Sequence, residues 1–325
     1  MNRNISRRDL LQQSAVASAG LLVGSIRDSS AEEHEAKFTP AEAAHPIVDA
    51  HQHLWDFRKF HPPWLKDEPK LNHSTTMLDY YKATAGLNVV KTVYMEVDVG
   101  PKQQLKEAEW VIDVCRKHNT PMAAGVVSCR PALPGFADYV KRFKGSPYIK
   151  GVRQVLQVPD APRGLCLQPA YVKSMRLLAE LGLSFDICIR PAELSDGIQL
   201  ADLCPETRFV LDHCGNASAR NPNHAQWARD IAEFGQRKNV VCKISGVIKT
   251  VQKGWDAGKE LEPIVLHCIR SFGADRVMFA ADWPVCNNTS SFRGWVAALR
   301  WILRNSSAED QRRIFHDNAM HYYGL

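Results

Sequence analysis

His51 and His53 stand one residue apart, directly after the apolar run Ile47 to Ala50, which has the composition of a β-strand. Because side chains alternate along an extended chain, both imidazoles should leave the same side of the strand. Two imidazoles so placed can bind one metal ion. The alternative is a polar strand end with two hydrogen-bonded histidines, and the spacing alone does not separate these possibilities.

A carboxylate near the other end of the chain repeats this arrangement. Asp282 follows the apolar run Val277 to Ala281. A lone charge after so apolar a run is costly unless it meets solvent in a cleft, pairs with a cation or binds a metal. In a closed barrel of parallel strands, the first and last strands are neighbours. If the sheet closes, Asp282 is therefore predicted to lie beside His51 and His53.

Eight short apolar segments, mostly separated by amphipathic helical patterns, predict a single-domain parallel (β/α)8 barrel, also called a TIM barrel. The segments begin near residues 47, 89, 122, 149, 184, 208, 240 and 277. Pro169 to Leu181 is the clearest helix, because proline begins it and Gly182 follows it. An open doubly wound sheet shows the same alternation, but polar residues gather at the end of nearly every strand, which favours a barrel. Residues 307–323 are expected to form a helix that closes it.

A long insertion from Asp56 to Asn88 follows the first strand and contains Pro62-Pro63-Trp64. Loops at the carboxyl ends of barrel strands build active sites, so we expect a partial lid here. The alternative is a surface elaboration that contacts no ligand.

Seven polar residues at predicted strand ends would share one crevice: His51, His53, Glu96, Arg153, His213, Lys243 and Asp282. Imidazoles and a carboxylate suit zinc or a similar divalent ion, with a position left open for water or substrate. Such an ion would polarise a carbonyl group, and Asp282 would accept a proton from the attacking water as general base. Without a metal, the histidines would donate hydrogen bonds to the developing oxyanion and Asp282 would still activate water.

The remaining candidates are substrate-binding residues. Arg153, Lys243 and Glu96 could recognise a hydroxyl-rich or carboxylate-bearing substrate. Alternatively, the two cations form ion pairs with Glu96 or another acidic residue at a strand end. Trp55 and Trp283 could stack on the apolar face of a sugar, or could equally be core residues.

Five motifs, taken in order, resemble the amidohydrolase-related branch of the amidohydrolase superfamily, and within it the sugar lactonases typified by L-fuconolactonase and L-rhamnonolactonase. They are Asp49-Ala50-His51-Gln52-His53, Leu211-Asp212-His213-Cys214-Gly215, Cys242-Lys243-Ile244-Ser245-Gly246, Ala281-Asp282-Trp283-Pro284 and Ile314-Phe315-His316-Asp317-Asn318-Ala319. The resemblance runs from about His45 to Leu325. It implies a barrel hydrolase that opens a small-molecule sugar lactone.

The resemblance leaves three points open. In its motif, His213 is a metal ligand, a donor to the carbonyl oxygen, or a histidine packed beneath a turn. The fifth strand, Ser184 to Ile189, supplies no histidine, which argues against two metals. Ala280-Ala281 stands where the sugar lactonases commonly have Gly-Ser, which weakens the assignment of a substrate. A metal-dependent decarboxylase of the same branch and a non-catalytic exported carbohydrate-binding barrel are the alternatives.

Composition excludes some partners. The chain has 41 Lys and Arg against 35 Asp and Glu, a net charge of +6, and the basic residues are scattered without interleaved aromatic residues. Nucleic acid is therefore not an expected partner. Nine cysteines lie mostly in apolar contexts and form no Cys-x-x-Cys pair, so we expect free thiols in the core.

The N-terminus reads as a targeting segment. Ser6-Arg7-Arg8-Asp9-Leu10-Leu11 is a twin-arginine pattern, and the apolar stretch from Ser14 to Ile26 is too short for a stable membrane span. We expect residues 1–31 to be a signal peptide for export out of the cytoplasm, 32–44 a linker and 45–325 the barrel. A tail with a chance arginine pair is the alternative.

Overall fold

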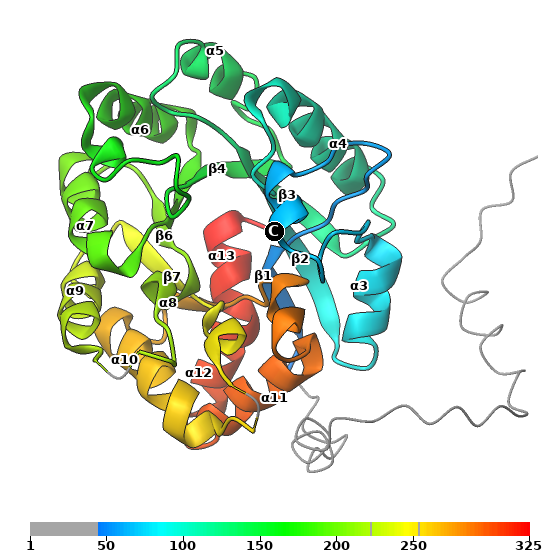
Figure 1. Ribbon diagram of the computed structural model, residues 1–325, viewed down its shortest axis with the longest axis vertical. Helices are drawn as coiled ribbons and strands as arrows, with labels where there is room; N and C mark the ends of the chain where they lie inside the picture. Colours follow the sequence, from blue (N-terminus) through cyan, green and yellow to red (C-terminus); the bar gives the residue numbers. More distant parts are fainter. Residues whose placement is uncertain (1–44, 222, 253) are drawn as a thin grey trace, which may run out of the picture.

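The computed structural model describes residues 45–221, 223–252 and 254–325. Its centre is one sheet of eight parallel strands that follow one another in chain order (Figure 1). The strands are β1 (Ile47–Gln52), β2 (Val89–Met95), β3 (Met122–Ser128), β4 (Ile149–Val155), β5 (Ser184–Cys188), β6 (Phe209–Leu211), β7 (Val240–Ile244) and β8 (Val277–Phe279). The predicted signal peptide and linker lie outside the described residues.

The sheet closes just beyond the ends of β1 and β8. The backbone N–H of Asp282 donates to the carbonyl of His51 at 3.1 Å, and that of His53 donates to Trp283 at 2.8 Å. Gln52 and Trp283 form an isolated parallel bridge. The first and last strands are therefore neighbours, and the predicted (β/α)8 barrel is confirmed.

A helix follows each strand, and these helices ring the barrel (Figure 1). They are α3 (Met77–Thr84), α4 (Gln104–Arg116), α5 (Phe136–Lys141), α6 (Pro169–Leu181), α7 (Leu194–Leu203), α9 (Ala225–Gly235), α10 (Glu262–Phe272) and α11 (Phe292–Ile302). Helix α6 has the predicted bounds, and Gly182 ends it with a left-handed φ of 71° that glycine adopts at little cost. Helices α3 and α11 were not predicted.

The last helices of the sequence close the amino end of the barrel. α12 (Ala308–Arg312), a π-helical turn (Arg313–Asp317) and α13 (Asn318–Tyr323) follow α11, and α13 lies at the centre of the barrel in Figure 1. Ala319 and Tyr323 pack inside the barrel against apolar side chains of β1, β2 and β8. Lys150, at the start of β4, donates to the carbonyl of Gly324 at 3.2 Å. The predicted closing role of this segment is confirmed.

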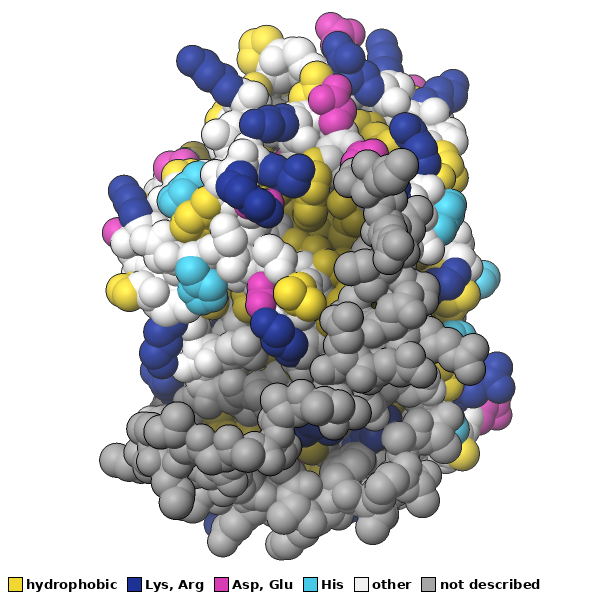
Figure 2. Space-filling model, turned by 90° about the vertical axis from the view of Figure 1, so that its right-hand side faces the viewer, with side chains coloured by type: hydrophobic (Ala, Val, Ile, Leu, Met, Phe, Trp, Pro, Cys, Tyr) yellow, Lys and Arg dark blue, Asp and Glu magenta, His cyan; other side chains and the backbone are white. Residues whose placement is uncertain are grey.

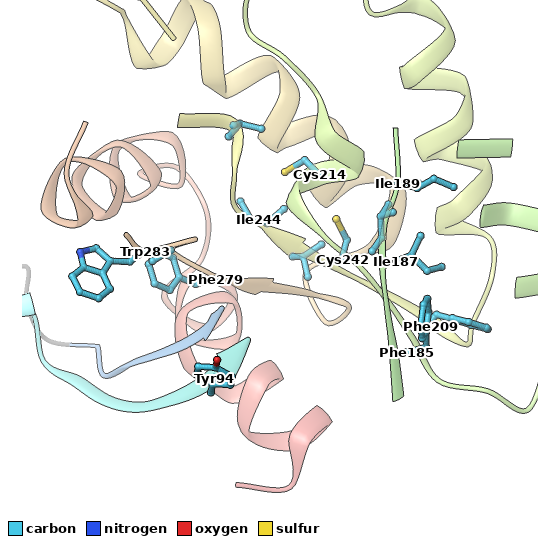
Figure 3. Packing of buried hydrophobic residues seen from close by; sticks show 14 of the residues in the cluster. Tyr94, Phe185, Ile187, Ile189, Phe209, Cys214, Cys242, Ile244, Phe279 and Trp283 are labelled. Carbon is cyan, nitrogen blue, oxygen red and sulfur yellow. The ribbon is translucent and has the colours of Figure 1, made fainter. Parts of the chain in front are cut away.

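The apolar core lies between the barrel wall and the surrounding helices. Phe185 and Phe209 meet there edge to face, and Cys214 and Cys242 lie among apolar side chains (Figure 3). All nine cysteines are buried and free, as predicted. Among the described residues, no helix has the length and apolar character needed to cross a membrane. On the face in Figure 2, Lys and Arg side chains are spread among other residues.

The insertion after β1 folds against neighbouring loops at the carboxyl end of the barrel. Trp64 donates its indole N–H to the carbonyl of Val97 after β2 at 2.8 Å, and Lys70 donates to the carbonyl of Asn288 after β8 at 3.2 Å. The second half of the insertion forms α3. This arrangement has the location expected of a partial lid.

Candidate active site

Three histidines and one aspartate meet at the carboxyl end of the barrel. His51 lies in β1 and His53 just after it, while His213 follows β6 and Asp282 follows β8. All four residues are buried or nearly so. The four residues that the sequence singled out as candidate ligands are thus brought together.

His51, His53 and Asp282 present their donor atoms to one point. The two Nε2 atoms are 3.1 Å apart, and Oδ1 of Asp282 lies 3.3 Å from Nε2 of His53 and 3.8 Å from Nε2 of His51. Ligands at 2.0–2.1 Å from a tetrahedral Zn²⁺ are about 3.3 Å from one another. The three donor atoms therefore fit three corners of a divalent-ion site and leave the fourth corner open.

A hydrogen bond on the far side of the His53 ring favours the tautomer that a metal needs. Nδ1 of His53 lies 3.0 Å from the carbonyl of Met95, which can only accept, so Nδ1 carries the proton and Nε2 has a free lone pair. Nδ1 of His51 lies 3.4 Å from Oδ1 of Asp212. Metal-binding histidines commonly have such carbonyl or carboxylate partners.

His213 belongs to a second possible ligand group with His51 and Asp212. Its ring centroid lies 4.6 Å from that of His51, and its Nδ1 is 2.9 Å from the hydroxyl of Ser245. A serine hydroxyl can donate or accept, so either tautomer of His213 is satisfied there. Its Nε2 can consequently serve as a ligand or as a donor.

The backbone carrying these residues is strained. His213 has a φ of 56° and begins α8 (His213–Asn216), in which all four residues are left-handed. Asp282 also has a φ of 56°. Left-handed backbone costs an L-residue about 1–2 kcal/mol. Hydrogen bonds from Trp227 to the carbonyl of Cys214 and from Asn216 to that of Ile189, both at 2.8 Å, hold the α8 turn. Strain of this kind is often found at functional sites.

A network of buried charges supports the site from inside the barrel. Arg153 pairs with Glu96 (Nε–Oε1, 2.6 Å) and with Asp212 (Nη1–Oδ2, 3.0 Å). Lys243 pairs with Asp186 at 2.5 Å and lies 3.3 Å from Asp212. For Arg153, Glu96 and Lys243, the structure therefore contains the ion pairs that the sequence left open as the alternative to substrate recognition.

The two tryptophans are buried in the core, which is the alternative to substrate contact that the sequence left open. Trp55 is fully buried, donates its indole N–H to the carbonyl of His73 and meets Trp64 edge to face. Trp283 is 3% exposed and packs edge to face on Tyr80. Both side chains are core residues in this structure, and their contact with a substrate stays a prediction.

Burial and neighbouring charges set the protonation states of the site. Burial lowers the pKa of His213 to about 4 and that of His51 well below its usual range, although nearby carboxylates act in the opposite direction. Burial would raise the pKa of Asp282, but Lys249 and the three histidines of the site outweigh it and hold that pKa well below its usual range. Near pH 7, His51 and His213 are therefore neutral, and Asp282 is ionised.

Asp212 and Lys249 take part in the site although sequence reasoning did not select them. Asp212 directly precedes His213 at the end of β6, so its position was an available signal. Lys249 lies in a 3-10 turn (Val247–Thr250) after β7 and places Nζ 3.2 Å from Oδ2 of Asp282. No local pattern marks Lys249, because the contact depends on the loop conformation.

Comparison with known proteins gives consistent matches. The amidohydrolase family model matches residues 48–325. An uncharacterized protein of Sinorhizobium fredii is 28% identical over 307 residues, covering 85% of this chain and 98% of that protein. An L-fucono-1,5-lactonase of Burkholderia ambifaria is 26% identical over 287 residues, covering 86% of this chain and 95% of that protein.

A solved structure shares the fold. The crystal structure of an amidohydrolase from Burkholderia multivorans with bound zinc superposes with a TM-score of 0.76 at 20% identity, covering 86% of this chain and 99% of that one. The likeness therefore extends over the whole barrel.

Proposed function

Because this chain belongs to the amidohydrolase family, we propose that it hydrolyses the cyclic ester of a sugar-type lactone at the site formed by His51, His53, His213 and Asp282. It is an enzyme of the amidohydrolase type, and relatives named as lactonases support a lactone as its substrate. The observation that carries the proposal is the position of Asp282, whose carboxylate lies 3.3 Å from Nε2 of His53 at the open end of the barrel.

His51, His53 and Asp282 would hold the divalent ion, which we take to be zinc because two imidazoles and a carboxylate suit it. When bound, zinc polarises a carbonyl oxygen and lowers the pKa of a water molecule. The partners of the two rings, Met95 and Asp212, orient the imidazoles for this task.

Asp282 acts as the base. Its Oδ1 faces His51 and His53, which leaves Oδ2 to take a proton from water as the water oxygen bonds to the lactone carbonyl carbon. The bond from that carbon to the ring oxygen then breaks, and the ring oxygen takes up the proton. The product is an open-chain hydroxy acid, which loses one proton to solvent near pH 7.

His213 can stabilise the oxygen of the carbonyl group during attack. Its Nδ1 lies 4.0 Å from Oδ2 of Asp282, whereas His53 lies beside Oδ1. If Ser245 donates to Nδ1, the Nε2 atom carries a proton and can donate to the developing oxyanion. This role does not require a metal, so the same residues serve both versions of the mechanism.

Replacing Asp282 by Asn tests the proposal. The variant should keep its circular dichroism spectrum and lose nearly all turnover of a lactone panel, measured as proton release. Carbon dioxide release from phenolic acids, measured in parallel, distinguishes the decarboxylase alternative. Turnover near the wild-type rate in the Asp282→Asn variant would contradict the proposal.

A further inference from the structure

Lys249 is the most exposed of the charged side chains that the described residues contribute to the site. Its side chain is 27% exposed, compared with 2% for Asp282 and 5% for Arg153. The pair between Lys249 and Asp282 thus joins a buried carboxylate to a cation that reaches solvent. Lys249 is therefore the partner of this pair that a molecule from solvent can more readily contact.

The loop that carries Lys249 is held on both sides. Gly246, which precedes the turn, has a φ of 71°, and a Cβ atom there would come within 2.6–2.9 Å of the His213 side chain, so the backbone packs tightly on that ring. On the other side, the carbonyl of Lys249 accepts a hydrogen bond from the hydroxyl of Thr289 at 2.9 Å. The backbone is therefore fixed, and only the long side chain is free to reorient.

Lys249 covers the oxygen that the mechanism needs. Oδ1 of Asp282 faces His53 and His51, while Oδ2 lies 3.2 Å from Nζ of Lys249. The ammonium group occupies one acceptor site of Oδ2 and stabilises its negative charge, which makes Asp282 a weaker base as long as Lys249 stays there. Asp282 becomes a stronger base when Lys249 exchanges this carboxylate for another acceptor on the solvent side.

The acceptor must be an anion. Separating the largely buried pair of Lys249 and Asp282 costs interaction free energy. A hydrogen bond from Lys249 to a neutral hydroxyl group recovers only a small part of that free energy, whereas an ion pair with a second carboxylate recovers most of it. Arg130 and Arg190, two other cations after strand ends, pair with Asp98 and Glu193, so a substrate carboxylate bound to either arginine would not release an oxygen of Asp282.

We propose that Lys249 binds a carboxylate of the substrate, so that the enzyme prefers a lactone carrying a carboxylate, such as the lactone of a sugar diacid, over a neutral lactone. The inference rests on the proposed function. The carboxylate lies toward solvent from Asp282, while the reacting carbonyl lies toward His51 and His53. Binding of the carboxylate draws the ammonium group away and frees Oδ2 in the same step.

Two lactones of the same ring size test this preference. D-Galactaro-1,4-lactone carries a carboxylate at the terminal carbon where D-galactono-1,4-lactone carries a neutral hydroxymethyl group. For the wild-type enzyme, kcat/KM should be at least about tenfold higher for the anionic lactone, chiefly through a lower KM. In Lys249→Met the ratio should fall to about one, and Lys249→Arg should keep most of the preference.

Lys70→Met is the matched control, because it removes one exposed positive charge from the same end of the barrel without touching the site. It should leave the ratio unchanged. An unchanged ratio in Lys249→Met, or a wild-type enzyme that prefers the neutral lactone, would overturn the inference. So would an equal loss of kcat for both lactones, which would indicate that Lys249 acts on the carbonyl oxygen common to them.

A binding measurement separates this inference from the proposed function. If the wild-type enzyme hydrolyses neither lactone, nor any in a wider panel, the proposed function fails. Calorimetry with galactarate and galactonate then still decides the role of Lys249. Tighter binding of galactarate that is lost in Lys249→Met supports the carboxylate site, and equal binding of the two acids rejects it.

Discussion

The Nζ atom of Lys243 lies 2.5 Å from Oδ2 of Asp186 inside the barrel, and neither side chain is exposed to solvent. A buried ion pair adds little net stability when desolvation offsets its attraction, but removing one partner leaves a buried charge without compensation. Asp212 lies 3.3 Å from the same nitrogen, so loss of the lysine affects two carboxylates.

Replacing Lys243 by Met should lower the free energy of unfolding by about 3–5 kcal/mol. Adding Asp186→Asn should restore part of this loss, because Asp186 loses its partner at 2.5 Å, whereas Asp212 keeps its pair with Arg153. Urea denaturation of the wild type, both single variants and the double variant measures the coupling. Lys82→Met is the control, since its pair with Asp79 is exposed and should contribute less than about 1 kcal/mol. Equal losses for the two lysines would contradict the burial argument.

Glu107 should make the protein less stable as pH rises. Burial, with the negative charge of Glu96, raises the pKa of Glu107 to about 7, although Ser128 and the backbone of Val97 donate hydrogen bonds to it. Between about pH 4.5 and 7, the folded state keeps a proton that the unfolded chain has lost, so the free energy of unfolding falls across this window.

The Glu107→Gln variant isolates this effect. Between pH 4.5 and 7, the wild type should lose up to about 3 kcal/mol of unfolding free energy relative to the variant. Above pH 7, the difference between the two proteins should stay constant. Urea denaturation at several pH values gives the curve. Glu109→Gln, an exposed position on the same helix, serves as the control. A difference that does not change with pH would rule out the raised pKa.

Removing a ligand should weaken metal binding. His53→Ala takes away one of three donor atoms that lie 3.1–3.8 Å apart, so the dissociation constant for Zn²⁺ should rise at least about 100-fold. Calorimetry on chelator-treated protein measures this, and zinc should raise the melting temperature of the wild type more than that of the variant. His267→Ala, whose ring bonds the carbonyl of Ala228 outside the site, is the control. Identical zinc affinity in all three proteins would leave the ligand assignment without support.

Export should depend on the arginine pair. Changing Arg7 and Arg8 together to Lys should keep the protein in the cytoplasm, because a twin-arginine signal is an address read by a receptor. Cell fractionation and blotting detect the change. Arg3→Lys is the control and should leave the distribution of the protein between the cytoplasm and the exported fraction unchanged. Export of the double variant at the normal level would show that this segment is not a twin-arginine signal.

Local signals predicted most of the fold. Proline and glycine marked both ends of α6, and apolar runs marked all eight strands, with β7 beginning at the predicted residue 240. The two helices that were missed also carry caps: Asp79 accepts from Thr76 at the start of α3, and Ser291 accepts from Gly294 in α11. Helix α3 has only eight residues within a proline-rich insertion, and such short helices depend on tertiary packing. Here Tyr80 supplies that packing against Trp283.

The site was predictable only in part. Strand ends placed His51, His53, His213 and Asp282 together, because a barrel brings the carboxyl ends of its strands to one face. The partners of each charge were not predictable in the same way. Lys249 reaches Asp282 across 33 positions of the sequence through the conformation of one turn, and no periodicity encodes that contact.

The packing of Ala319 and Tyr323 inside the barrel has a consequence for biosynthesis. The ribosome makes α13 after all eight strands, and β1 cannot lie beside β8 until β8 has been made. A nascent chain that stops short of residue 318 would expose the apolar inner faces of β1, β2 and β8 and become a substrate for chaperones or proteases.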